Sequence, residues 1–303
     1  PAYGISGLES DSSSKSDVGS IYPQIKVLAD QCQYPMSWLV KDYRNASAYR
    51  DAVKEKVLSL FHYDPPPASP APEVVGRWET AEYIQEKILF STAPWFRVPA
   101  YILIPKGIYK PAPAIVDLHS HGDLFVYGKE KVMPMPEGDP PIITRYRHRN
   151  YEGRSTSLAL CRRGYVVISI DCFYFGERRT IFWDDFQKWG GDRSKYALED
   201  ADVMDHRANS NESILARALF WAGTTWNGIV HWDDIRTVDY LVTRPEVDPK
   251  RIGCIGISMG GWRTDFLAAL DDRIQCAVSI GWMATFRQLL KAYVEIHSFT
   301  HFV

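Results

Sequence analysis

Four short apolar runs restrict the fold of this chain more than any other feature of its sequence. They are PAIVDLH (113–119), YVVISID (165–171), RIGCIGI (251–257) and IQCAVSIGW (274–282). Runs that are apolar throughout are typical of strands covered on both faces of a parallel sheet. Helical patterns occupy about 153–163, 212–243 and 259–270. Strand alternating with helix predicts a mostly parallel, doubly wound α/β domain with helices on both faces.

The sequence before the first of these runs predicts an antiparallel edge and an N-terminal extension. The β-rich segments 81–92 and 96–107 are separated by a short turn, which favours an antiparallel pair. Apolar residues recur at helical spacing over 38–61, and the proline-rich stretch 64–72 cannot continue a helix. The polar, serine-rich stretch 5–20 is typical of a loop or tail. We therefore expect residues 1–75 to be a tail, an amphipathic helix and a linker, and residues 76–303 to be the α/β domain.

Two intervals within the α/β part are too long to be plain connections. Residues 123–151 and 173–210 contain many aromatic and charged side chains but show weak periodicity. Long loops on a compact sheet are commonly lids or binding loops. Their aromatic residues would form either a substrate pocket or the core of a lid, and the sequence leaves both open: Phe125, Tyr127, Phe173, Tyr174, Phe175 and Trp183.

Composition narrows the class of function. The 303 residues carry a net charge of −2, which gives no broad electrostatic reason to bind nucleic acid or an anionic membrane. No apolar stretch approaches the ~20 residues that span a bilayer, and no secretory signal pattern opens the chain. The five cysteines are scattered, without CxxC pairs, so we expect buried free thiols. A cytoplasmic protein is the resulting expectation, although a removed leader is compatible with a chain that starts at Pro1.

A candidate nucleophile follows the third apolar run. Residues 256–260, GISMG, match the G-x-S-x-G pattern, with a predicted strand before them and a helical pattern after them. This context defines a nucleophile elbow, a sharp turn that presents the serine hydroxyl. Side chains at Gly256 and Gly260 would collide with the neighbouring helix and strand. We therefore predict that Ser258 is the nucleophile.

A serine nucleophile needs donors for the oxyanion that forms during attack. The stretch DLHSHGD (117–123) ends the first apolar run and fits this role. We expect the Met259 N–H and an N–H of Gly122 or Asp123 to form the oxyanion hole. His121 could also line the substrate pocket. We expect His119 and His121 to be structural rather than metal ligands, because the sequence offers no further ligands beside them.

Three segments together resemble the dienelactone-hydrolase and acetyl-xylan-esterase type of α/β-hydrolase. They are HSHGDLFVYGKEKV (119–132), GYVVISIDCFYFGERR (164–179) and DDIRTVDYLVTRPEVDPKRIGCIGISMGGW (233–262). The similarity covers about residues 76–303 and implies an α/β-hydrolase fold with Ser258 as the nucleophile of an ester hydrolase. It also implies a loop near the site that contains Asp171, Gly176, Glu177 and Arg178. Phe125 and Tyr174 are pocket candidates because they lie in the long loops, independently of the resemblance. We expect Glu177 and Arg178 to form a structural ion pair first and substrate contacts second.

The catalytic acid and base are the part of the pattern that the sequence does not supply. In this fold both follow the serine, and two further strand–helix units of about 30 residues each normally carry them. Asp265, Asp271 and Asp272 fall in or after the predicted elbow helix, away from the strand tips. Glu295, His297 and His301 lie in a segment that would lead into a cap. We expect the chain to be truncated at its C-terminus, with the acid and base beyond Val303.

These patterns predict a serine hydrolase that cleaves acetyl-ester or dienelactone-like substrates through an acyl-enzyme intermediate. We expect a small-molecule ester as partner and no cofactor or metal, and self-association is left open. A peptidase or amidase of the same fold is one alternative, because the elbow does not fix the leaving group. A non-catalytic binding protein that retains the fold is the other.

Overall fold

The structure is a computed structural model that describes residues 16–108, 111–283, 285 and 289–291. Residues Phe61–Trp282 form one compact unit. The described parts of Pro1–Leu60 and Met283–Val303 form another, which contains η2 (Gly19–Ile21), α1 (Tyr22–Asp30) and α2 (Ala46–Phe61) up to residue 60. The boundary predicted at residue 75 remains a prediction.

The N-terminal helix is shorter than its periodicity predicts. Apolar spacing placed its start at Trp38, whereas α2 begins at Ala46. The Asn45 side chain accepts a hydrogen bond from the Ala48 N–H at 2.9 Å, which satisfies one of the N–H groups that have no partner within the first turn. The helix therefore starts at this cap.

A mixed sheet forms the centre of the larger unit. Among the described residues, seven strands are ordered β1-β2-β3-β5-β4-β6-β7. They are β1 (Glu73–Glu79), β2 (Tyr83–Ala93), β3 (Phe96–Pro105), β4 (Ala112–Leu118), β5 (Val166–Ile170), β6 (Val247–Ile257) and β7 (Ile274–Ile280). The pairings β1/β2, β2/β3 and β3/β5 are antiparallel, and β4/β5, β4/β6 and β6/β7 are parallel. The antiparallel pair expected at 81–107 is confirmed, but a mostly parallel sheet is not, since three pairings of each kind occur.

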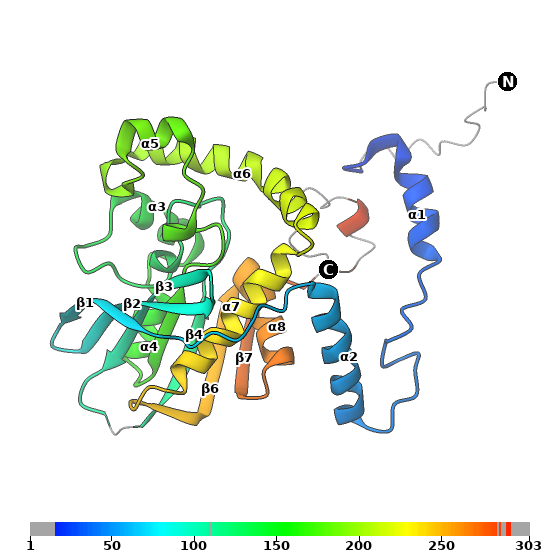
Figure 1. Cartoon of the computed structure of the whole chain (residues 1–303), viewed down its shortest axis with the longest axis horizontal. Coiled ribbons are helices and arrows are strands. Elements are labelled where there is room, and N and C mark those ends of the chain that lie inside the picture. The colour runs from blue at the N-terminus through cyan, green and yellow to red at the C-terminus, as the bar shows by residue number, and fades with distance from the viewer. Residues whose placement is uncertain (1–15, 109–110, 284, 286–288, 292–303) are drawn as a thin grey trace. The chain divides into compact units, whose positions relative to one another are not determined.

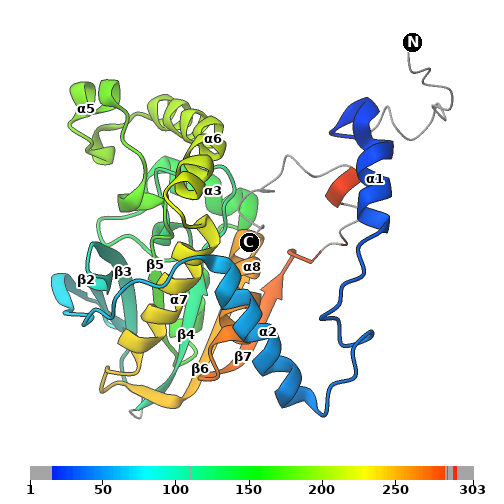
Figure 2. The ribbon, with the colours of Figure 1, turned by 45° about the vertical axis from the view of Figure 1, so that its right-hand side comes forward.

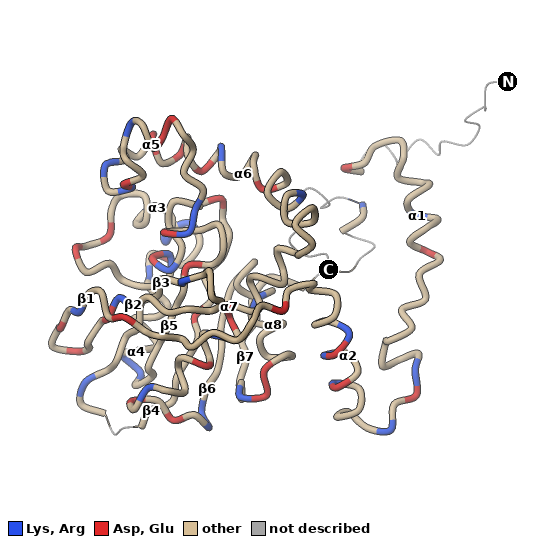
Figure 3. Tube along the Cα trace, in the orientation of Figure 1, with Lys and Arg blue, Asp and Glu red and all other residues tan. Residues whose placement is uncertain are grey.

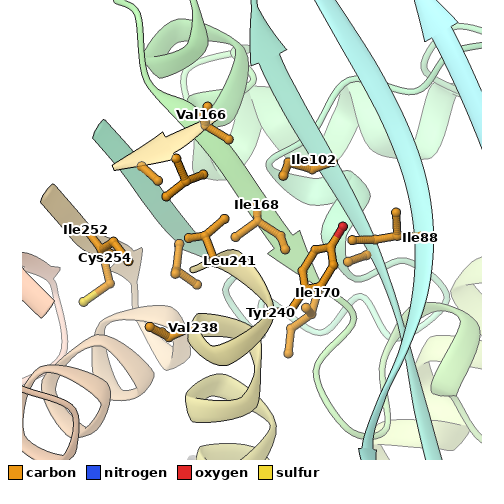
Figure 4. Packing of buried hydrophobic residues seen from close by; sticks show 14 of the residues in the cluster. Ile88, Ile102, Val166, Ile168, Ile170, Val238, Tyr240, Leu241, Ile252 and Cys254 are labelled. Carbon is orange, nitrogen blue, oxygen red and sulfur yellow. The ribbon is translucent and has the colours of Figure 1, made fainter. Parts of the chain in front are cut away.

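Helices cover both faces of this sheet, and the alternation of strand side chains fixes which residues face which helix (Figures 1 and 2). Ile102 of β3 points into the larger core with α7 (Trp226–Leu241) and α8 (Met259–Leu270). Its neighbours Tyr101 and Leu103 point to the opposite face, where α4 (Thr156–Cys161) packs. Figure 4 shows the larger core, with Val238, Tyr240 and Leu241 of α7 against strand residues.

The two long intervals contain helices beside the strand ends, as Figure 1 shows. They hold α3 (Pro141–Asn150), α5 (Trp183–Trp189) and the start of the 24-residue α6 (Leu198–Trp221), with the 3-10 turns η3 (Lys129–Lys131), η4 (Gly176–Arg178) and η5 (Arg193–Lys195). The single helix expected at 212–243 is two helices, α6 and α7. Gly223 has φ +81°, and Thr225 caps α7 by accepting a hydrogen bond from the Gly228 N–H at 2.9 Å.

The expectation that 274–282 is covered on both faces is wrong for the described structure. β7 is exposed along most of its length, and Val278 and Ile280 are 44% and 43% exposed. Among the described strands β7 has β6 as its one neighbour, so its apolar composition overstated its burial there.

The remaining compositional expectations have mixed outcomes. All five cysteines are free. Of the four in segments expected to be buried, Cys161, Cys172 and Cys254 are buried and Cys276 is exposed, as is Cys32 outside those segments. Lys and Arg are interspersed with Asp and Glu along the larger unit instead of gathering in a block (Figure 3). Within the described residues, every helix is too short or too polar to span a membrane.

Candidate active site

Ser258 stands at the junction of β6 and α8. Its backbone has φ +57° and ψ −122°, a conformation that residues other than glycine seldom adopt. Its N–H donates to the Ile280 carbonyl at 2.8 Å, and its carbonyl accepts from the Trp262 N–H at 3.0 Å. The residue is half-buried, and its hydroxyl makes no capping hydrogen bond to α8. The turn therefore fixes the backbone of Ser258 and leaves its hydroxyl out of the first turn of the helix.

Both elbow glycines lie where a side chain has no room. A Cβ on Gly256 would lie 2.2 Å from the Gly260 carbonyl oxygen, and a Cβ on Gly260 would lie 1.9 Å from the Leu118 carbonyl oxygen. Contacts this short require the backbone to move. The elbow thus packs directly against the end of β4, where the segment 119–123 begins.

The first turn of α8 supplies N–H groups at the elbow. Met259 is the first residue of the helix, and the first N–H groups of a helix have no acceptor within it. The partial positive charge of a helix N-terminus favours an anion there. The predicted oxyanion donor at Met259 therefore lies in a position suited to that role.

The segment after β4 has a left-handed backbone at two consecutive residues. Gly122 and Asp123 have φ +54° and φ +53°. The Asp123 N–H donates to His121 Nδ1 at 3.1 Å, so this amide already has an acceptor. A Cβ on Gly122 would lie 2.3 Å from the Tyr146 hydroxyl. Of the two predicted donors, Gly122 is the better candidate.

Both histidines of this segment are buried, and each is hydrogen-bonded to other parts of the protein. The His119 Nε2 accepts from the Cys172 N–H at 3.1 Å, which links the ends of β4 and β5, and burial lowers the pKa of His119 well below its usual value. His121 Nε2 lies 2.9 Å from a Glu212 carboxylate oxygen on α6. Burial lowers the pKa of His121, but hydrogen bonds to Asp123 and Glu212 outweigh this effect and raise it. His121 is 1% exposed, so its side chain packs within the protein and supports the 119–123 segment rather than facing solvent.

The loop after β5 is organised around a buried lysine. Lys129 Nζ contacts carboxylate oxygens of Asp171 at 2.8 Å, Glu130 at 2.9 Å and Glu177 at 2.6 Å. Gly176 has φ +62°, and a Cβ there would lie 2.3 Å from the Asp171 carboxylate. The three carboxylates lie within 4.8 Å of one another around the ammonium group, and Arg193 on Glu130 and Lys87 on Glu177 supply two further positive charges. The side chains of the loop predicted beside the site are therefore engaged in a network of ion pairs within the protein.

Glu177 and Arg178 do not pair with each other, contrary to expectation. Glu177 also contacts Lys87 Nζ at 2.8 Å, whereas Arg178 Nη1 donates to Asp233 on α7 at 2.7 Å. Their adjacent side chains point to partners on different elements. Each residue has an ion pair, but with a partner that sequence proximity does not reveal.

The aromatic residues divide between lid core and cavity wall. Phe125, Tyr174 and Phe175 are almost fully buried and contact one another, with Phe125 and Phe175 stacked at 4.8 Å. Trp183 is 75% exposed. Tyr127 lines a cavity of about 550 Å³ together with Met135, Ile142, Arg193 and Tyr196. Three of the six aromatic candidates thus belong to the buried core of these segments, and a fourth, Phe173, is half-buried against Phe96 and Trp226.

The candidates for acid and base do not assemble at Ser258 in the described residues. The Asp271 carboxylate accepts from Arg273 at 2.8 Å and lies at the far end of α8. Burial raises the pKa of Asp265, which is hydrogen-bonded to Ser279. Glu295, His297 and His301 lie outside the described residues.

The mixed sheet, the elbow and the loop after β4 define an α/β-hydrolase. The model of the Abhydrolase family matches residues 5–182, more than half of the chain, and that of the Dienelactone hydrolase family matches residues 149–288. The chain therefore belongs to the Abhydrolase family of α/β-hydrolases, as the sequence resemblance predicted.

Two particular relatives add detail. "Putative hydrolase YtaP" of Bacillus subtilis (strain 168) is 29% identical over 226 residues, which are 74% of this chain and 62% of that protein. The crystal structure of a "putative acetyl xylan esterase" from Bacteroides fragilis NCTC 9343 superposes with a TM-score of 0.60 at 20% identity, covering 84% of this chain and 58% of that one. The chain thus spans about three fifths of the length of either relative, and the structural likeness shows the fold.

Proposed function

We propose that this chain carries the nucleophile and the oxyanion donors of a serine hydrolase that cleaves carboxylic esters. The observation that carries the proposal is the geometry of Ser258, which is strained, half-buried and followed at once by the N-terminus of α8. A conformation of this kind costs ~1–3 kcal/mol and is typical of functional sites. Relatives named as hydrolase and acetyl xylan esterase support the same reaction class.

In the proposed reaction, the Ser258 hydroxyl attacks the ester carbonyl carbon and loses its proton to a general base. The negative charge that develops on the carbonyl oxygen is stabilised by the N–H groups of Met259 and Gly122. Collapse of this intermediate breaks the bond to the alcohol, which takes the proton, and water then releases the acid from the acyl-enzyme. The described residues after Ser258 include no histidine, so we place the base outside them.

The test is a comparison of two leaving groups with the protein expressed from its complete reading frame. We expect turnover of p-nitrophenyl acetate and its loss in Ser258→Ala. Turnover of aminoacyl-p-nitroanilides alone would overturn the esterase assignment in favour of a peptidase or amidase. No turnover of either substrate, together with unchanged ligand binding in Ser258→Ala, would favour a non-catalytic binding protein.

A further inference from the structure

A buried lysine holds the segment that carries the proposed oxyanion donor. Lys131 is fully buried, and its Nζ donates to the carbonyl oxygens of Ser120 and His121, each at 2.8 Å. The ammonium group also lies over the Phe175 ring, 4.4 Å from its centroid, and 5.4 Å from that of Tyr146. Among the described residues its hydrogen-bond partners are these two peptide carbonyls, whereas the neighbouring Lys129 binds carboxylates.

The His121 carbonyl belongs to the same peptide group as the Gly122 N–H. A cation on the carbonyl oxygen of a peptide polarises the whole group and makes its N–H a stronger donor, because hydrogen bonds in a chain reinforce one another in a low dielectric. The Tyr146 hydroxyl lies 3.4 Å from the same oxygen. The Leu124 N–H also donates to this oxygen at 3.4 Å. Lys131 is thus the one charged donor, and the one at the shortest distance, among three described donors to the carbonyl whose peptide carries the proposed oxyanion donor.

The surrounding contacts fix the lysine and the segment relative to each other. Arg147 of α3 donates through Nε to the Lys131 carbonyl at 3.1 Å. The Ser120 hydroxyl is hydrogen-bonded to Tyr146 at 2.7 Å and to Tyr151 at 2.8 Å. The position of the Lys131 ammonium group is therefore set by packing on several sides, as a preorganised site requires.

We propose that Lys131 is a positioning residue for ester hydrolysis, whose ammonium group orients and polarises the 121–122 peptide so that the Gly122 N–H can stabilise the oxyanion. This inference rests on the function proposed above. Lys131 contacts neither the nucleophile nor, in the proposed role, the substrate. It acts through the peptide that it binds.

The charge of Lys131 makes the inference testable by pH. Burial lowers the pKa of Lys131 to about 7, although nearby acidic groups oppose this shift. The titratable groups that face it are Asp205 of α6, Asp171 and Cys172 after β5, Asp123, His119 and His121 after β4, and Tyr146 of α3. Because the protonated form polarises the peptide, kcat should fall as the pH rises above 7.

The first experiment compares Lys131→Met with wild type and with the control Lys250→Met. Lys250 is exposed and lies near the start of β6, at the end opposite Ser258. Loss of one direct oxyanion donor typically lowers kcat by about 100- to 1000-fold. For an indirect contribution we expect a loss of roughly 10- to 100-fold in kcat on p-nitrophenyl acetate, with KM changed by less than about threefold. Lys250→Met should match wild type. A Lys131→Met enzyme with wild-type kcat would overturn the inference.

The pH profile keeps the inference testable if Lys131→Met does not fold. Wild-type kcat should decline between pH 7 and 9, and Lys131→Arg, which stays protonated, should lose that decline. A wild-type rate that is constant or still rising over this range would contradict the inference, as would an unchanged decline in Lys131→Arg. The two proposals can be refuted separately. A wild-type protein that neither turns over esters nor reacts with a fluorophosphonate would refute the proposed function. An active wild type with an equally active Lys131→Met variant would refute this inference alone.

Discussion

Replacing Ser258 with glycine should stabilise the fold while abolishing activity. With φ +57° and ψ −122°, Ser258 occupies a region that costs a non-glycine residue ~1–3 kcal/mol. The extra freedom that glycine gains in the unfolded chain offsets about 0.4–1 kcal/mol of the relief. The net change in the free energy of unfolding should therefore be an increase of about 1 kcal/mol. Ser258→Ala is the matched control, because it removes the hydroxyl but keeps the Cβ and the strain.

The assay is urea-induced unfolding of the complete protein and of both variants, followed by tryptophan fluorescence. We expect Ser258→Gly to unfold at a higher urea concentration than Ser258→Ala, with an unchanged slope, and to melt about 2–4 °C higher for a domain of this size. Both variants should be inactive. A glycine variant that is no more stable than the alanine variant would refute the view that the elbow is strained.

Three further changes test other parts of the account. Gly260→Ala would place a Cβ 1.9 Å from the Leu118 carbonyl oxygen. Because the backbone must then move, the variant should lose about 1–3 kcal/mol of stability, and its kcat should fall roughly 100-fold. A variant that unfolds in urea with wild-type stability would contradict this packing. Burial raises the pKa of Asp117 to about 6, so between its unfolded and folded pKa values the folded state holds a proton that the unfolded state has lost. Wild-type stability should therefore fall by about 2 kcal/mol as the pH rises from about 4 to 7. Asp117→Asn should remove this dependence, and parallel pH curves for the two proteins would count against it. Lys129→Met would remove the cation from Asp171, whereas Glu130 would keep Arg193 and Glu177 would keep Lys87. The change should destabilise by about 3–5 kcal/mol because it leaves a buried carboxylate without its partner. A neutral effect on the melting temperature would mean that the network adds little.

The elements that the sequence predicts well are those whose signals are local. The apolar runs at 113–119, 165–171 and 251–257 coincide with β4, β5 and β6, because a strand buried on both faces must be apolar throughout. β7 has the same composition, yet it is exposed, since burial depends on neighbours that composition does not report. The short helices α3 and α5 lie in intervals whose periodicity was too weak to show them.

The same contrast separates the elbow from its surroundings. Gly256 and Gly260 are required by contacts within the turn and with the adjacent strand end, so five residues were enough to suggest them. The Lys129–Asp171 pair joins residues 42 positions apart, and Lys131 reaches carbonyls 10 and 11 positions away. A run such as GKEK is typical of an exposed turn, and nothing in it indicates that both lysines are buried.

Covalent labelling measures directly whether the Ser258 hydroxyl is an activated nucleophile at the N-terminus of α8. The complete protein, treated with a fluorophosphonate probe and digested, should carry one adduct on the peptide that contains Ser258, and Ser258→Ala should carry none. An adduct on another residue, or no adduct in a protein that turns over p-nitrophenyl acetate, would contradict this role of Ser258.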